Sequence, residues 1–171
     1  WFDKKRNLPI VIFNNGVGSM QVPDWQIYKD WAALTAANGM IALTHQSRFG
    51  KTENDLNDLL EHLRKHSEEL KVDKDNIAVW VCSANTPTGW SAANDPDKDF
   101  IKAIAIYYGV TRPKERIVKR KDLEILVVRA GLDSHNINAG LEEFMQNALQ
   151  ADAHVEFINY PEGQHAFDGV D

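Results

Sequence analysis

Six short apolar runs, rich in β-branched residues, constrain the fold of this chain more than any other feature. Runs of this length without polar alternation are typical of strands that are covered on both faces of a sheet. Between several of them lie helical patterns, such as the leucines of residues 56–63, which recur every three or four positions. Strands that alternate with helices predict an α/β fold, with a mostly parallel sheet of about six strands flanked by helices. The predicted strands are residues 9–14, 40–44, 77–82, 101–108, 123–129 and 155–160.

Composition limits the partners of the chain. Its 171 residues are 43% hydrophobic and 26% charged, which suits one domain with its own core. The formal net charge of −6 argues against nucleic acid or an anionic membrane as the main partner. No stretch approaches the ~20 apolar residues of a membrane span. Nothing in the sequence indicates the oligomeric state.

The sequence says little about localisation. A single cysteine, Cys82, excludes an internal disulfide and leaves the compartment open. No signal peptide is visible, but the chain starts at Trp1 without a methionine, so an upstream segment with an export signal stays open. We leave the localisation undetermined, with a cytoplasmic location favoured.

Residues 76–88 carry the most suggestive pattern for chemistry. An apolar run ends at Cys82 and gives way to Ser83 and then to small, polar, helix-starting residues. A strand that breaks into a sharp turn and a helix lifts a serine hydroxyl above the end of a sheet. The usual pattern around such a serine is G-x-S-x-G, whereas Val81 and Asn85 occupy the glycine positions here. We expect the β-branched Val81 to crowd the turn, while asparagine tolerates unusual dihedral angles better.

Two further polar side chains follow predicted strands. Ligands of parallel sheets bind beyond the carboxyl ends of the strands, where Ser83 follows the third predicted strand, Asp133 the fifth and His165 the sixth. Acyl transfer needs a hydroxyl that attacks, an imidazole that takes its proton and a carboxylate that orients the imidazole. The order Ser, Asp, His along the chain is that of α/β-hydrolases. The sequence therefore predicts Ser83 as nucleophile, His165 as base and Asp133 as its orienting acid.

These segments resemble the α/β-hydrolase superfamily, of the dienelactone-hydrolase-like or small carboxylesterase type. Residues 77–85 are similar to the elbow strand I-x-V-W-G-x-S-A-G, residues 130–133 to the acid loop and residues 160–167 to the histidine loop. The resemblance covers residues 8–168 and implies a three-layer α/β-hydrolase-like sandwich that lacks the first two strands and the final helix of the full fold. Residues 1–171 would then be a single domain, as a trimmed core or a fragment of a longer protein.

The resemblance also implies an activity. It points to hydrolysis of a small or medium carboxylic ester through an acyl-enzyme, with no cofactor and no metal. By position, the backbone N–H groups of Val17 and Ala84 would stabilise the oxyanion. Activity is expected to rise with pH as His165 loses its proton. The sequence does not determine the acyl or alcohol specificity.

Several residues leave alternatives open. Cys82 adjoins the serine, and dienelactone hydrolases use a cysteine nucleophile, but its place one residue before the turn favours packing. His45 follows a strand and either contacts substrate or lies in solvent. His62 and His66, one helical turn apart, offer two metal ligands without a third at suitable spacing. Trp90 either lines a pocket or caps the sheet, and the polar segment after it, residues 91–98, is predicted to be a loop.

Two other functions compete with a hydrolase. A catalytically degenerate member of the fold that binds a ligand or partner is favoured by Val81 and Asn85. A nucleotide-binding domain is suggested by Gly16 and Gly18 after the first strand. The dinucleotide pattern, however, requires a third glycine where Gln21 stands.

Overall fold

The structure, a computed structural model, describes residues 6–15, 24–112 and 116–169. Six strands form one sheet in the order β2-β1-β3-β4-β5-β6, and every neighbouring pair is parallel. The prediction of a mostly parallel sheet of about six strands is therefore confirmed. The strands are β1 (Leu8–Asn14), β2 (Ile41–Thr44), β3 (Val72–Cys82), β4 (Ile101–Tyr107), β5 (Glu124–Ala130) and β6 (His154–Tyr160).

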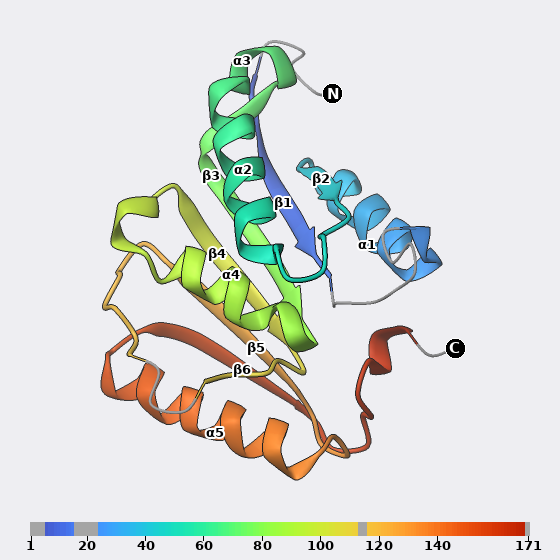
Figure 1. The fold of residues 1–171 in the computed structure, drawn as a ribbon, viewed down its shortest axis with the longest axis vertical. Helices are drawn as coiled ribbons and strands as arrows, with labels where there is room; N and C mark the ends of the chain where they lie inside the picture. The colour runs from blue at the N-terminus through green and yellow to red at the C-terminus, as the bar shows by residue number, and fades with distance from the viewer. Residues whose placement is uncertain (1–5, 16–23, 113–115, 170–171) are drawn as a thin grey trace.

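Helices cover both faces of this sheet. Figure 1 shows α2, α4 and α5 side by side along one face. Their buried side chains, such as Leu56 and Phe144, pack on Ile12 and Val79 of the sheet. On the opposite face, Tyr28 of α1 packs in a second cluster of buried side chains. None of these helices is long and apolar enough to cross a membrane, within the ranges described above. The helices are α1 (Gln26–Ala37), α2 (Thr52–Lys65), α3 (Ser67–Leu70), α4 (Thr86–Ala93) and α5 (His135–Gln150), with short 3₁₀ turns η2 (Ser83–Asn85), η3 (Pro96–Lys98) and η4 (Phe167–Gly169).

The segment after the elbow differs from the prediction of a loop over residues 91–98. Helix α4 continues through Ala93, and its last residues are buried although their neighbours are polar. Trp90 is 1% exposed and meets the ring of Phe144 edge-on, with centroids 4.8 Å apart. Trp90 therefore belongs to the core between α4 and α5, which explains why the helix extends past it.

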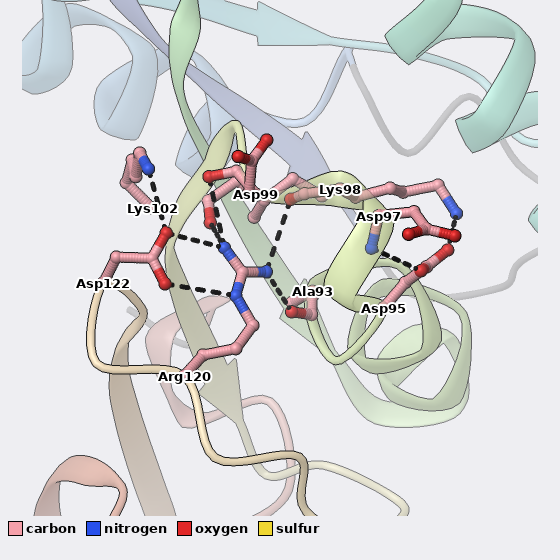
Figure 2. A network of polar contacts seen from close by, with 9 residues as sticks. Ala93, Asp95, Asp97, Lys98, Asp99, Lys102, Arg120 and Asp122 are labelled. Carbon is pink, nitrogen blue, oxygen red and sulfur yellow. Dashed lines mark hydrogen bonds and ion pairs between the residues drawn. The ribbon is translucent and has the colours of Figure 1, made fainter.

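A buried arginine attaches the connection between β4 and β5 to the end of α4 (Figure 2). Arg120 donates to the carbonyl oxygens of Ala93 and Ile101, each at 2.8 Å. It also donates to the carboxylate of Asp122 at 3.2 Å, and this contact lowers the pKa of Asp122. Because Ala93 ends the helix that begins behind Ser83, Arg120 anchors the far end of that helix.

Candidate active site

Ser83 lies at a sharp turn between β3 and α4. Its φ angle is +50°, in the left-handed region, which costs a non-glycine residue about 1–2 kcal/mol. The turn is held on both sides, because the carbonyl oxygen of Ser83 accepts hydrogen bonds from the backbone N–H groups of Val110, at 3.1 Å, and Thr86. The sequence-based expectation of a serine at a strained strand-to-helix turn is thus met in the backbone.

Val81 is accommodated by a glycine in the facing helix. Its side chain is 0% exposed, and a Cβ atom built on Gly89 would lie 2.2 Å from Val81 Cγ1. The missing side chain of Gly89 therefore supplies the space that Val81 fills. Crowding, which we expected in the turn, is instead relieved by α4 eight residues further along the chain.

Asn85 holds the end of the β1 segment against the turn. Its backbone is close to helical, with φ −88°, so this position does not require the tolerance of unusual dihedral angles that asparagine offers. Its buried side chain instead donates from Nδ2 to the carbonyl oxygen of Asn15. This contact joins residues 70 positions apart, and no local sequence pattern indicates it.

Ser83, His165 and Asp133 form a chain of hydrogen bonds. His165 Nδ1 lies 2.6 Å from Asp133 Oδ2, and His165 Nε2 lies 3.0 Å from Ser83 Oγ. The side chain of Asp133 is 4% exposed and that of His165 is 39% exposed. Because a carboxylate only accepts, Nδ1 carries the proton and Nε2 presents its lone pair to the serine hydroxyl. The three side chains predicted from sequence are therefore brought together, in the tautomer that proton abstraction requires.

The acid and histidine loops are fastened to each other by backbone contacts. Gly131 N–H donates to the carbonyl of Tyr160 at 2.7 Å, and Leu132 N–H donates to that of Gly163 at 2.9 Å. A Cβ atom on Gly131 would lie 2.3 Å from the carbonyl oxygen of Pro161, so only glycine allows this approach. The loops after β5 and β6 thus hold their side chains at a fixed separation.

Asp133 is also fixed by its own turn. Its Oδ1 accepts a hydrogen bond from the backbone N–H of Ser134 at 2.7 Å. Ser134 in turn caps α5, since its hydroxyl accepts from the N–H of Ile137 at 3.4 Å. One carboxylate oxygen is therefore held by the backbone while the other faces the imidazole.

The expected oxyanion donors are only partly visible. Val17, like Gly16, Gly18 and Gln21 of the nucleotide-binding pattern, lies outside the described residues. Ala84 is exposed and follows Ser83 in the first turn of η2. N–H groups in a first helical turn have no acceptor within the helix, which leaves them available to an anion.

The cysteine beside the serine packs away from the turn. Cys82 is buried, and its Sγ lies 3.7 Å from the hydroxyl of Tyr28, on the face of the sheet covered by α1. Strand alternation explains this placement, because neighbouring side chains of a strand point to opposite faces. The packing interpretation of Cys82 is confirmed.

The other histidines considered in the sequence analysis contact neighbouring side chains. His45 Nε2 lies 3.1 Å from Asn14 Oδ1, and burial lowers the pKa of His45. The rings of His62 and His66 stack with centroids 4.5 Å apart. Across the described part of the chain, no three His, Cys, Asp or Glu side chains gather in a way that could hold a metal ion.

A groove lies elsewhere on the molecule. It has a volume of about 640 Å³, runs along the sheet face beside α1 and is lined by side chains such as Trp80 and Tyr107. Ser83, Asp133 and His165 do not line it.

Comparisons with known proteins agree with this geometry. A model of the family described as "Dienelactone hydrolase family" matches residues 22–169, while no curated protein matches the chain. One similar solved structure is MGS-M1, an α/β hydrolase enzyme from a Medee basin deep-sea metagenome library, with 18% identity and a TM-score of 0.75 over 96% of this chain and 72% of that one. Another is the thermophilic esterase Est2 of the planctomycete Thermogutta terrifontis, with 16% identity and a TM-score of 0.77 over 98% and 75%. At this identity, the likeness shows the α/β-hydrolase fold.

Proposed function

Because this chain belongs to the dienelactone hydrolase family, we propose that it is a serine hydrolase that cleaves small or medium carboxylic esters. Ser83 is the nucleophile, His165 the general base and acid, and Asp133 the residue that orients the imidazole. One observation carries the proposal: Ser83 Oγ lies 3.0 Å from His165 Nε2, while Nδ1 of the same ring lies 2.6 Å from Asp133. That arrangement gives the serine hydroxyl a base with the correct tautomer.

In the first half of the reaction, Ser83 Oγ forms a bond to the ester carbonyl carbon and its proton passes to His165 Nε2. The buried carboxylate of Asp133 stabilises the resulting imidazolium. The carbonyl electron pair moves onto oxygen, where the N–H of Ala84 and, by position in the family, that of Val17 would donate to it. Each donor of this kind is worth about 3 kcal/mol in the transition state.

In the second half, the tetrahedral adduct collapses and the ester C–O bond breaks. The leaving alcohol takes the proton from His165, and the acyl group stays on Ser83. Water then attacks the acyl carbon while His165 accepts its proton, and a second collapse returns that proton to Ser83 and releases the acid. Every proton in this cycle is transferred between side chains, water and the leaving alcohol, so the proposed reaction requires no cofactor.

Short acyl chains are the first substrates to try. The Thermogutta esterase has been solved with propionate bound and with butyrate bound. We therefore propose acetate, propionate and butyrate esters as substrates, and p-nitrophenyl esters of these acids report cleavage directly.

The test is the rate of p-nitrophenyl butyrate hydrolysis by wild type, Ser83→Ala and Cys82→Ala. We expect Ser83→Ala to lose at least about 10⁴-fold in kcat/KM. Cys82→Ala should stay within about threefold of wild type, because its thiol packs on the other side of the strand. Equal rates for wild type and Ser83→Ala would refute the proposal. An inactive wild type would favour the alternative, a degenerate member of the fold that binds a ligand or partner.

A further inference from the structure

A tyrosine and a second carboxylate lie beside His165 and have no part in the reaction described above. Tyr108 follows β4 and is 3% exposed. Its hydroxyl donates to Asp168 Oδ1 at 2.6 Å, and its ring meets the imidazole of His165 edge-on, with centroids 4.9 Å apart. Since Asp168 comes three residues after His165, this hydrogen bond ties the segment that carries the base to the end of β4.

The segment needs such a tie because its backbone is strained and bonds within itself. Ala166 has a φ angle of +60°, which costs a non-glycine residue about 1–2 kcal/mol. The backbone bonds that follow His165 run from Phe167 N–H to Gln164 and from Gly169 N–H to Ala166. Attachment of this turn to the sheet therefore comes from side chains. Strained residues persist only where the surroundings over-determine them.

Tyr108 is suited to be the fixed end of the contact. Its own φ angle is +36°, and its backbone N–H donates to the carbonyl of Val128 in the neighbouring strand at 2.8 Å. The sheet thus sets the direction of the ring and of the hydroxyl. A displacement of the backbone turn that carries His165 therefore strains the bond between Tyr108 and Asp168.

Asp168, at the other end of the contact, is also held in place. Asp168 is half-buried, and this burial raises its pKa. A buried carboxylate requires a donor, which the Tyr108 hydroxyl supplies. Next to it, Phe167 packs on the rings of Tyr160 and Tyr108, with centroid distances of 4.9 and 5.8 Å. The turn after His165 is therefore anchored by one hydrogen bond and one aromatic contact surface.

We propose that Tyr108 and Asp168 form a clamp that positions His165, so that Nε2 faces the hydroxyl of Ser83. Neither side chain exchanges a proton in the proposed reaction: the Tyr108 ring packs on the imidazole and its hydroxyl holds Asp168, so both are positioning residues. The idea rests on the proposed function, because positioning matters only if His165 acts as the base. Misplacement of a catalytic group by about 1 Å can cost about 10²-fold in rate.

The test compares Tyr108→Phe, which keeps the ring and removes the hydroxyl, with Asp168→Asn, which keeps an acceptor oxygen. Tyr28→Phe is the matched control, since Tyr28 is another buried tyrosine of the same cluster and its hydroxyl contacts the thiol of Cys82. We expect Tyr108→Phe to lower kcat about 10–100-fold with KM within about twofold of wild type. Asp168→Asn should lose less than about fivefold, and Tyr28→Phe should keep kcat within about twofold.

A second readout does not depend on activity. The proton on Nδ1 of His165, shared with Asp133, should give a downfield proton NMR signal that is absent from Asp133→Ala. We expect Tyr108→Phe to broaden or remove that signal, while Tyr28→Phe leaves it in place. If the wild type cleaves no ester but shows this pattern, the proposed function fails and the clamp stands. If Tyr108→Phe keeps both the signal and the wild-type kcat, the clamp is wrong.

Discussion

Replacing Gly89 with alanine tests how the turn at Ser83 accommodates Val81. In a helix interior, glycine to alanine normally stabilises by about 1 kcal/mol. Here the new methyl carbon would lie 2.2 Å from Cγ1 of Val81, a side chain that is 0% exposed. Overpacking of this kind costs about 1–3 kcal/mol. Because the contact is so short, we take the upper end of that range, and the net effect is a loss of about 2 kcal/mol.

The assay is urea unfolding of Gly89→Ala in two backgrounds. With Val81→Ala also present, Cγ1 is gone and the nearest Val81 atom, Cβ, would lie 3.4 Å away, an ordinary contact. In that background we expect the same glycine to alanine change to become stabilising, by up to about 1 kcal/mol. Gly140→Ala in α5 is the control, because the one short contact of its new Cβ would be with the side-chain hydroxyl of Thr111, at 2.7 Å, and the backbone oxygen of Thr111 would lie at 3.8 Å. A neutral or stabilising Gly89→Ala in the wild-type background would refute the reasoning.

Three further predictions follow from the site and its supports. Asp133→Asn should lower kcat about 10⁴-fold in ester hydrolysis, because the amide favours the wrong imidazole tautomer; a loss under tenfold would contradict its role. Arg120→Leu should lower the free energy of unfolding by about 3 kcal/mol in denaturant titrations, because buried carbonyl oxygens lose their donor. The control is Lys119→Ala, which breaks an exposed ion pair and should lower the free energy of unfolding by less than about 0.5 kcal/mol. The pKa of Asp122 is lowered by Arg120 and then Lys102, so its stabilisation is present above its unfolded pKa of about 3.9 and is lost as pH falls below it. Urea titrations should therefore show the difference between wild type and Asp122→Asn shrinking below about pH 4; a difference that is constant from pH 7 to pH 3 would contradict this.

The sheet and the spacing of the site residues are predictable from sequence because they depend on local patterns. Buried parallel strands leave continuous apolar runs, and such runs preceded Ser83, Asp133 and His165. Parallel strands bring their carboxyl ends to one edge of the sheet. The sequence pattern alone therefore predicts that residues in the loops after these strands lie at the same edge. That inference holds although Ser83 and His165 are 82 positions apart.

The contacts that support the site cannot be predicted from the sequence, because each one joins distant residues. Val81 looks unfavourable until Gly89 is known to face it. Asn85 looks like a weak substitute for glycine until its bond to Asn15 is seen. The prediction of a loop over residues 91–98 is wrong for residues 91–93, which are helical because the burial of Trp90 against α5 outweighs the polar composition around it.

The central claim is that Ser83 is a nucleophile activated by His165. The most direct measurement is intact-mass spectrometry after incubation with a fluorophosphonate, followed by peptide mapping. We expect one adduct per chain, located on Ser83, absent from Ser83→Ala and formed much more slowly in His165→Gln. A wild-type chain that gains no adduct, or an adduct that persists in Ser83→Ala, would contradict it.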